Sequence, residues 1–139
     1  NICRSAAAEY LLRHYIQEML PGRANNIQVK SAGLAAVVGS APHHHTQALM
    51  RNAGVDCSAH RAQQLNGDML TNADLVLVME YTHKRHIEAQ YPQSCGKIFL
   101  LGEWTDGVEI VDPYNKPEQS FIEVQQLIEL GLKQWVQKL

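Results

Sequence analysis

The stretch Leu75-Val76-Leu77-Val78-Met79 is a run of five consecutive apolar residues. An apolar run of this length is typical of a strand that is covered on both faces, as in the parallel sheet of an α/β protein. A segment with helical character follows over residues 81–91, and residues 98–101 repeat the apolar pattern. Because parallel strands need a crossover connection, this strand–helix–strand order predicts a parallel sheet.

The segments outside this unit predict more helices and one more strand. Residues 8–20 place apolar side chains at intervals of three and four, which predicts a helix that ends at Pro21-Gly22. Residues 27–31 alternate apolar and polar side chains, the period of a short strand. A loop over residues 33–42 and a short helix over residues 45–52 should follow. The last helix can begin at Pro117 and run to the C-terminus, with an apolar stripe of Phe121, Val124, Leu127, Ile128, Leu132, Trp135, Val136 and Leu139.

The whole chain, residues 1–139, has the length of one α/β domain with a parallel sheet between helices. A helix that opens such a domain normally follows the strand whose carboxyl end carries the ligand loop. Here the first helix starts almost at Asn1. We therefore expect the first strand of the sheet in residues that precede Asn1.

Composition and charge exclude several classes of function. Lys and Arg number 12 and Asp and Glu 14, a formal net charge of −2, so we expect no binding to nucleic acid or to an anionic membrane through a global positive field. No apolar run approaches the about 20 residues that cross a bilayer. The 3 cysteines are too few and too widely spaced for a secreted disulfide scaffold, which favours the cytoplasm.

The opening segment Asn1-Ile2-Cys3-Arg4-Ser5 leads directly into the first helix. Backbone N–H groups at a helix N-terminus bind anions, and an arginine there can hold two phosphate oxygens at once. Considered alone, Arg4 also fits an ordinary solvated surface charge.

A second candidate group lies in Val111-Asp112-Pro113-Tyr114, between a glycine-bearing loop and the last helix. Connections that follow sheet strands commonly carry active-site groups. Asp112 could donate a proton to a leaving oxygen, a role that accelerates reactions by about 10² to 10⁴. Considered alone, this segment also fits a simple turn.

The two motifs, in this order, resemble those of the low-molecular-weight protein tyrosine phosphatases, whose signature is Cys-x5-Arg-Ser near the N-terminus with a distant Asp-Pro-Tyr. The resemblance covers nearly the whole chain. Further matching positions are Ala8-Glu9, Ser31-Ala32-Gly33, Ala62 with Gln64, residues 74–79 and Gly96-Lys97. It implies a three-layer α/β sandwich with a four-stranded parallel sheet flanked by helices, whose first strand is absent from this chain.

The resemblance also implies an activity: hydrolysis of phosphotyrosine through a phosphocysteine intermediate, without metal or cofactor. The nucleophilic cysteine would stand three residues before Asn1, since Cys3 matches the second cysteine of the signature. The implicated residues are Arg4 and Asp112 in catalysis, Asn1, Ile2, Cys3 and Ser5 in the phosphate-binding loop, and Val37 and Tyr114 in the walls of the substrate cleft.

The implied partners are a phosphotyrosine protein and, at the same site, inorganic phosphate or another oxyanion. Residues 33–39 and 110–116 are most similar to bacterial family members that dephosphorylate the tyrosine autokinases of capsule or exopolysaccharide export. Val37 falls where several relatives carry Trp or Leu, which predicts a smaller cleft wall.

Two other functions stay open at this point. Arsenate reduction on the same fold would need two further thiols close together, and Cys57 and Cys95 are far apart in the sequence. A catalytically dead module that only binds phosphotyrosine or an anion is the other alternative. The consecutive His43, His44 and His45 cannot easily face one ion, so we predict no metal site there. His60 either supports the phosphate-binding loop or is a buried structural residue.

Overall fold

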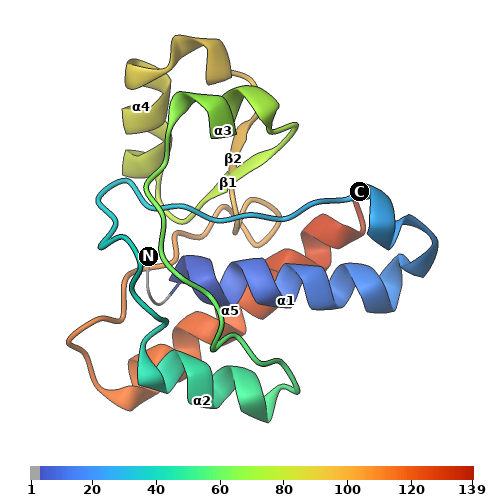
Figure 1. Ribbon diagram of the computed structural model, residues 1–139, viewed down its shortest axis with the longest axis vertical. Coiled ribbons are helices and arrows are strands. Elements are labelled where there is room, and N and C mark those ends of the chain that lie inside the picture. The colour runs from blue at the N-terminus through green and yellow to red at the C-terminus, as the bar shows by residue number, and fades with distance from the viewer. Residues whose placement is uncertain (1–3) are drawn as a thin grey trace.

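The computed structural model describes residues 4–139, and Figure 1 shows its arrangement. Asn1, Ile2 and Cys3 of the predicted phosphate-binding loop therefore lie outside the described residues. In chain order the elements are α1 (Arg4–Met19), η1 (Pro21–Asn26), α2 (His44–Asn52), α3 (Gly67–Asn72), β1 (Val76–Val78), α4 (Tyr81–Gln90), η2 (Pro92–Ser94), β2 (Ile98–Leu100) and α5 (Glu118–Val136). None of these helices is both long and apolar enough to cross a membrane, a finding limited to residues 4–139.

The predicted helices form close to their expected bounds. α1 ends at Met19, just before the proline of η1, and α5 begins directly after Pro117 but stops at Val136. The polar connection before β1 contains a helix that the sequence did not predict, α3. Its N-cap is Asn66, whose side chain accepts a hydrogen bond from the backbone N–H of Met69 at 2.9 Å.

The sheet confirms the central strand–helix–strand unit. β1 and β2 are parallel, with Val76 opposite Ile98 and Val78 opposite Leu100, and α4 is the crossover between them. The fold is thus α/β with a parallel sheet flanked by helices.

The number of strands is smaller than predicted, since the described residues form a two-stranded sheet. The prediction of a strand over residues 27–31 is wrong for this structure. The expected alternation of half-buried and exposed side chains is present there, but no strand pairs with this segment within residues 4–139. An isolated parallel bridge between Gly33 and Gln64 lies further along. Alternation reports which face is buried, whereas a strand also needs a neighbour that the local sequence cannot supply.

The core has two parts. The larger lies mainly between α1 and α5 and includes Leu11, Ile128 and Leu132, each almost fully buried. The smaller lies between the sheet, α3 and α4, around Leu70 and Leu100. Figure 1 shows α1 and α5 side by side below the sheet. Arg4 therefore stands at the start of a helix that is packed firmly against α5.

Gly131 lies where α5 approaches the end of β2, and it provides a test of this packing. A Cβ at this position would stand 2.6 Å from Leu101 Cδ2 and 2.8 Å from the Leu101 backbone oxygen. We expect Gly131→Ala to lower the free energy of unfolding by about 1 to 3 kcal/mol, because the overlap outweighs the gain in helix propensity.

Chemical denaturation measures this loss. Gly22→Ala is the control, because nothing lies within 4 Å of its Cβ position; its effect should stay within about 0.5 kcal/mol. Equal stability of the Gly131→Ala variant and the wild type would contradict this account of the α5 and β2 contact.

Candidate active site

Arg4 is the first residue of α1 and is held on the inside of the molecule. Its Nη1 donates hydrogen bonds to Glu80 Oε2 at 2.5 Å and to the Ile110 carbonyl at 2.8 Å. Only 11% of its side chain is exposed. The alternative of a solvated surface arginine is therefore wrong. Ser5 follows in the first turn of α1 and is half-buried.

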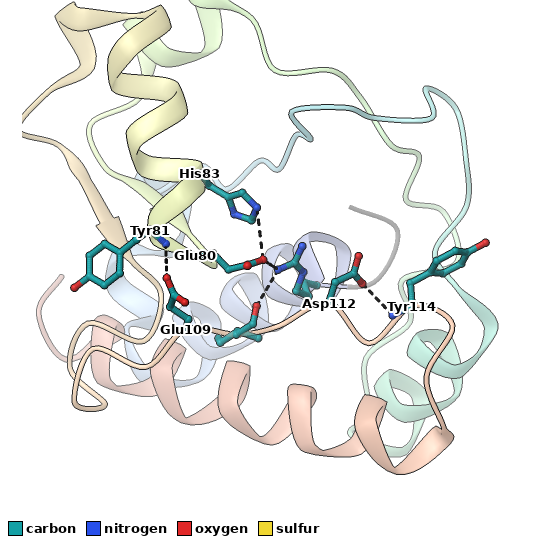
Figure 2. A network of polar contacts seen from close by, with 8 residues as sticks. Glu80, Tyr81, His83, Glu109, Asp112 and Tyr114 are labelled. Atoms are coloured by element: carbon teal, nitrogen blue, oxygen red, sulfur yellow. Dashed lines mark hydrogen bonds and ion pairs between the residues drawn. The ribbon is translucent and has the colours of Figure 1, made fainter.

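Glu80 lies at the carboxyl end of β1, directly before α4. It occupies the N-cap position of α4, yet its side chain makes no capping hydrogen bond. The backbone N–H of Tyr81 instead donates to Glu109 Oε1 at 2.8 Å, as Figure 2 shows. The Glu109 carboxylate, from another loop, thus accepts the first N–H group of α4. The Glu80 carboxylate is left to bind Arg4.

His83 approaches the same carboxylate from the first turn of α4. Its Nε2 lies 3.6 Å from Glu80 Oε2 (Figure 2). Burial lowers the pKa of His83, as does the charge of Arg4, while the Glu80 carboxylate opposes the shift. His83 is therefore mainly neutral at pH 7 and adds little charge beside Arg4.

Asp112 lies in a turn that is tied to the same framework. Its Oδ1 accepts a hydrogen bond from the Tyr114 backbone N–H at 3.0 Å, while the side chain remains exposed. Pro113 between them is almost fully buried and anchors the turn. Two residues earlier, Ile110 receives the Arg4 hydrogen bond on its oxygen and donates its own N–H to Met79 O at 2.9 Å. Hydrogen bonds therefore join the segments that carry Arg4, Glu80 and the Asp112 turn directly to one another.

The two residues predicted to wall the cleft come from different loops. Val37 is 71% exposed on the loop before α2, and Tyr114 is 51% exposed in the turn after Asp112. In Figure 2 the Tyr114 ring points away from Asp112. Both side chains are thus available to a large ligand.

The Gln64 side chain holds the backbone of the Val37 loop. Its Oε1 accepts from Ala36 N at 2.9 Å, and its Nε2 donates to Leu34 O at 2.7 Å. One amide side chain therefore fixes the backbone on either side of Ala35, a contact that the sequence did not predict.

The three consecutive histidines form part of a stack of rings. The rings of His43 and His44 lie 4.3 Å apart between centroids, and His43 stacks on Phe121 of α5 at 4.7 Å. Burial lowers the pKa of His43, and the neighbouring His44 and His45 lower it further. Within residues 4–139, no group of three or more His, Cys, Asp or Glu side chains could hold a metal ion.

His60 is buried beside Glu9. Its Nδ1 lies 3.7 Å from Glu9 Oε1, which also accepts a hydrogen bond from Ser31 Oγ at 2.6 Å. Burial lowers the pKa of His60. Its Nε2 has no hydrogen-bond partner among the residues described. A role for His60 in the phosphate-binding loop remains a prediction.

Sequence reasoning missed Glu80, the residue that contacts Arg4 most closely. A signal was present, because Glu80 is the first polar residue after the apolar run 75–79. Side chains at the carboxyl ends of parallel strands often face the ligand in α/β proteins.

Comparisons with known proteins agree with the geometry. The model of the family described as "Low molecular weight phosphotyrosine protein phosphatase" matches residues 1–139. A probable low molecular weight protein-tyrosine-phosphatase, EpsP of Ralstonia nicotianae, is 39% identical over 139 residues, which cover 100% of this chain and 90% of that protein.

Solved structures show the same likeness. The tyrosine phosphatase Wzb from Escherichia coli K30, in complex with sulphate, has a TM-score of 0.88 and 34% identity, covering 99% of this chain and 91% of that chain. The YwlE arginine phosphatase from Geobacillus stearothermophilus has a TM-score of 0.86 and 31% identity, covering 99% of this chain and 86% of that chain. The chain therefore belongs to the low molecular weight phosphotyrosine protein phosphatase family.

Proposed function

We propose that this protein is a protein tyrosine phosphatase that forms a phosphocysteine intermediate. The observation that carries the proposal is Arg4 at the start of α1, hydrogen-bonded to the carbonyl of Ile110 two residues before Asp112. Arg4, the proposed phosphate-binding group, is thereby linked to the turn that carries Asp112, the proposed proton donor. The nucleophile is the cysteine that we expect three residues before Asn1.

In the first step, the cysteine thiolate attacks phosphorus and the P–O bond to the tyrosine ring breaks. The α1 N-terminus and the Arg4 charge favour the thiolate and the anionic phosphoryl group. Arg4 holds the equatorial oxygens as charge spreads over them. Asp112 gives its proton to the departing phenolic oxygen, so the leaving group departs as neutral tyrosine.

In the second step, water hydrolyses the phosphocysteine. The Asp112 carboxylate takes a proton from the water as its oxygen attacks phosphorus, and the P–S bond breaks. Inorganic phosphate leaves, the thiolate is restored and Asp112 is again protonated. Neither step uses a metal or cofactor.

The substrate we propose is a phosphotyrosine protein, specifically a tyrosine autokinase of capsule or exopolysaccharide export in the cytoplasm. The similarity to EpsP and Wzb supports this choice. Val37 and Tyr114, both exposed, would contact the aromatic ring and its flanking residues.

The experiment compares three substrates with the full-length protein expressed from its gene. Peptides of one sequence carry phosphotyrosine, phosphoserine or phosphoarginine at the same position, and released phosphate is measured. We expect phosphotyrosine to be preferred by kcat/KM over both others by about 10-fold or more. Preference for phosphoarginine would assign the activity named for the YwlE relative and overturn the proposed substrate.

The same preparation tests the two alternatives. Phosphate binding without hydrolysis of any substrate would indicate a dead binding module. Thiol-dependent reduction of arsenate would indicate the reductase, although Cys57 is only 1% exposed in the core and Cys95 is on the surface. A residue other than cysteine three positions before Asn1 in the gene would also overturn the phosphatase mechanism.

A further inference from the structure

We propose that Glu80 is a positioning residue, which orients the Arg4 guanidinium for phosphoryl transfer. This inference rests on the proposed function. Glu80 does not touch the substrate and acts only through Arg4.

The contact between the two side chains is short and sheltered. Nη1 and Oε2 lie 2.5 Å apart, with 11% of the Arg4 side chain and 28% of the Glu80 side chain exposed. A charge-assisted hydrogen bond in such surroundings is stronger and less screened than a surface ion pair. The same Nη1 also donates to Ile110 O at 2.8 Å. Two acceptors on different segments thus fix one nitrogen of the guanidinium.

Fixing Nη1 has a consequence for the other nitrogens. The guanidinium is planar and rigid, so anchoring one nitrogen also restricts Nη2 and Nε. Neither of these nitrogens donates a hydrogen bond to any residue within 4–139. Among the residues described, the arrangement leaves the Nη2 and Nε donors for a ligand, and these two donors form the edge that bidentate phosphate recognition requires.

The local structure shows why Glu80 is available for this contact. A polar N-cap residue commonly bonds the free N–H groups of its own helix. Here Glu109 accepts the Tyr81 N–H at 2.8 Å, so the Glu80 carboxylate is not needed at α4. Neutral His83 at 3.6 Å does not compete with Arg4 for the charge of Glu80.

The test compares Glu80→Gln, Glu80→Asp and the control Glu109→Gln in the full-length protein. Glu80→Gln replaces a charge-assisted hydrogen bond with a weaker neutral one and so loosens the guanidinium. The kcat on phosphotyrosyl peptide should fall about 10-fold or more, because small misplacements in a transition state are costly. The inhibition constant of inorganic phosphate should stay within about 3-fold or improve, since a negative charge near the dianion is lost. Glu80→Asp, which keeps the charge, should recover part of kcat.

The control removes an acidic charge from the same network without touching Arg4. Glu109→Gln keeps an oxygen acceptor for Tyr81 N, and kcat should stay within about 2-fold of the wild type. A fall in kcat with Glu80→Gln that Glu109→Gln reproduces would indicate a structural role and overturn the proposal. Unchanged turnover with Glu80→Gln would also overturn the proposal. Faster turnover would overturn it as well, by showing that Glu80 competes with the substrate for Arg4.

A second readout follows Arg4 without turnover. Nitrogen-15 NMR of the side chain reports rotation about the Cζ–Nε bond, with Arg4→Lys used to assign the signal. We expect hindered rotation in the wild type and faster rotation in Glu80→Gln. Equal rotation in both would refute the positioning role, whereas an inactive wild type with hindered rotation would refute the phosphatase function alone.

Discussion

Arg4→Lys should reduce kcat/KM for p-nitrophenyl phosphate by about 100-fold or more, because an ammonium cannot supply the planar pair of donors that the transferring phosphoryl group needs. The structure adds a second reason. Arg4 holds Glu80 and the Ile110 carbonyl with Nη1, while its Nη2 and Nε bond no residue within 4–139. A lysine has a single nitrogen for all of these partners, so it would satisfy either the framework or the phosphate.

Steady-state kinetics of the full-length variant measures this effect. Arg85→Lys is a matched control, because Arg85 is exposed on α4 and the same exchange there should leave kcat/KM within about 2-fold of the wild type. Thermal unfolding should show that both variants are folded. If Arg4→Lys keeps more than about a third of the wild-type activity, Arg4 does not bind the transition state as proposed.

Asp112→Asn should slow the release of basic leaving groups by about 100-fold or more, the scale of general acid catalysis. The exchange preserves the turn, because an amide oxygen can still accept the Tyr114 N–H that now lies 3.0 Å from Oδ1. It removes the proton that the leaving oxygen requires. Binding of phosphate or vanadate should hold or tighten slightly, because a negative charge beside the anion is lost.

A series of substituted phenyl phosphates separates these effects. The variant should lose most kcat on esters whose phenols have a high pKa, and less on activated esters that leave without a proton. Asp106→Asn is the control, since Asp106 is an exposed carboxylate on the preceding loop and should not change the leaving-group dependence. Equal slowing of every ester by Asp112→Asn would instead point to a positional or folding role.

The parts of the fold that the sequence predicted depend on local patterns. Helix periodicity, Pro21 after α1 and the apolar run before Glu80 each act within a few residues, and the structure has the corresponding elements. The segment 27–31 shows the limit of such patterns. Its alternation is correct, but pairing depends on a neighbour that is distant in the chain.

The candidate site shows the same division. The sequence singled out Arg4 and Asp112 because motifs place charged groups beside a helix start and a rigid proline turn. It did not reveal that Arg4 pairs with Glu80, 76 positions away, since that contact exists only after β1 and α1 have packed. Nor could the sequence show that Glu109 accepts the backbone N–H of Tyr81 at the start of α4.

The Gln64 amide has an evolutionary consequence. Its partners in residues 34–36 are main-chain atoms, so the contact does not depend on the side chains of those residues. The neighbouring Val37 and Val38 side chains are each 71% exposed. Exchanges at these two positions should therefore leave the loop conformation and global stability nearly unchanged, since exposed substitutions are usually close to neutral. The loop surface is thus free to diversify by single exchanges of exposed residues, while the inherited backbone stays the same.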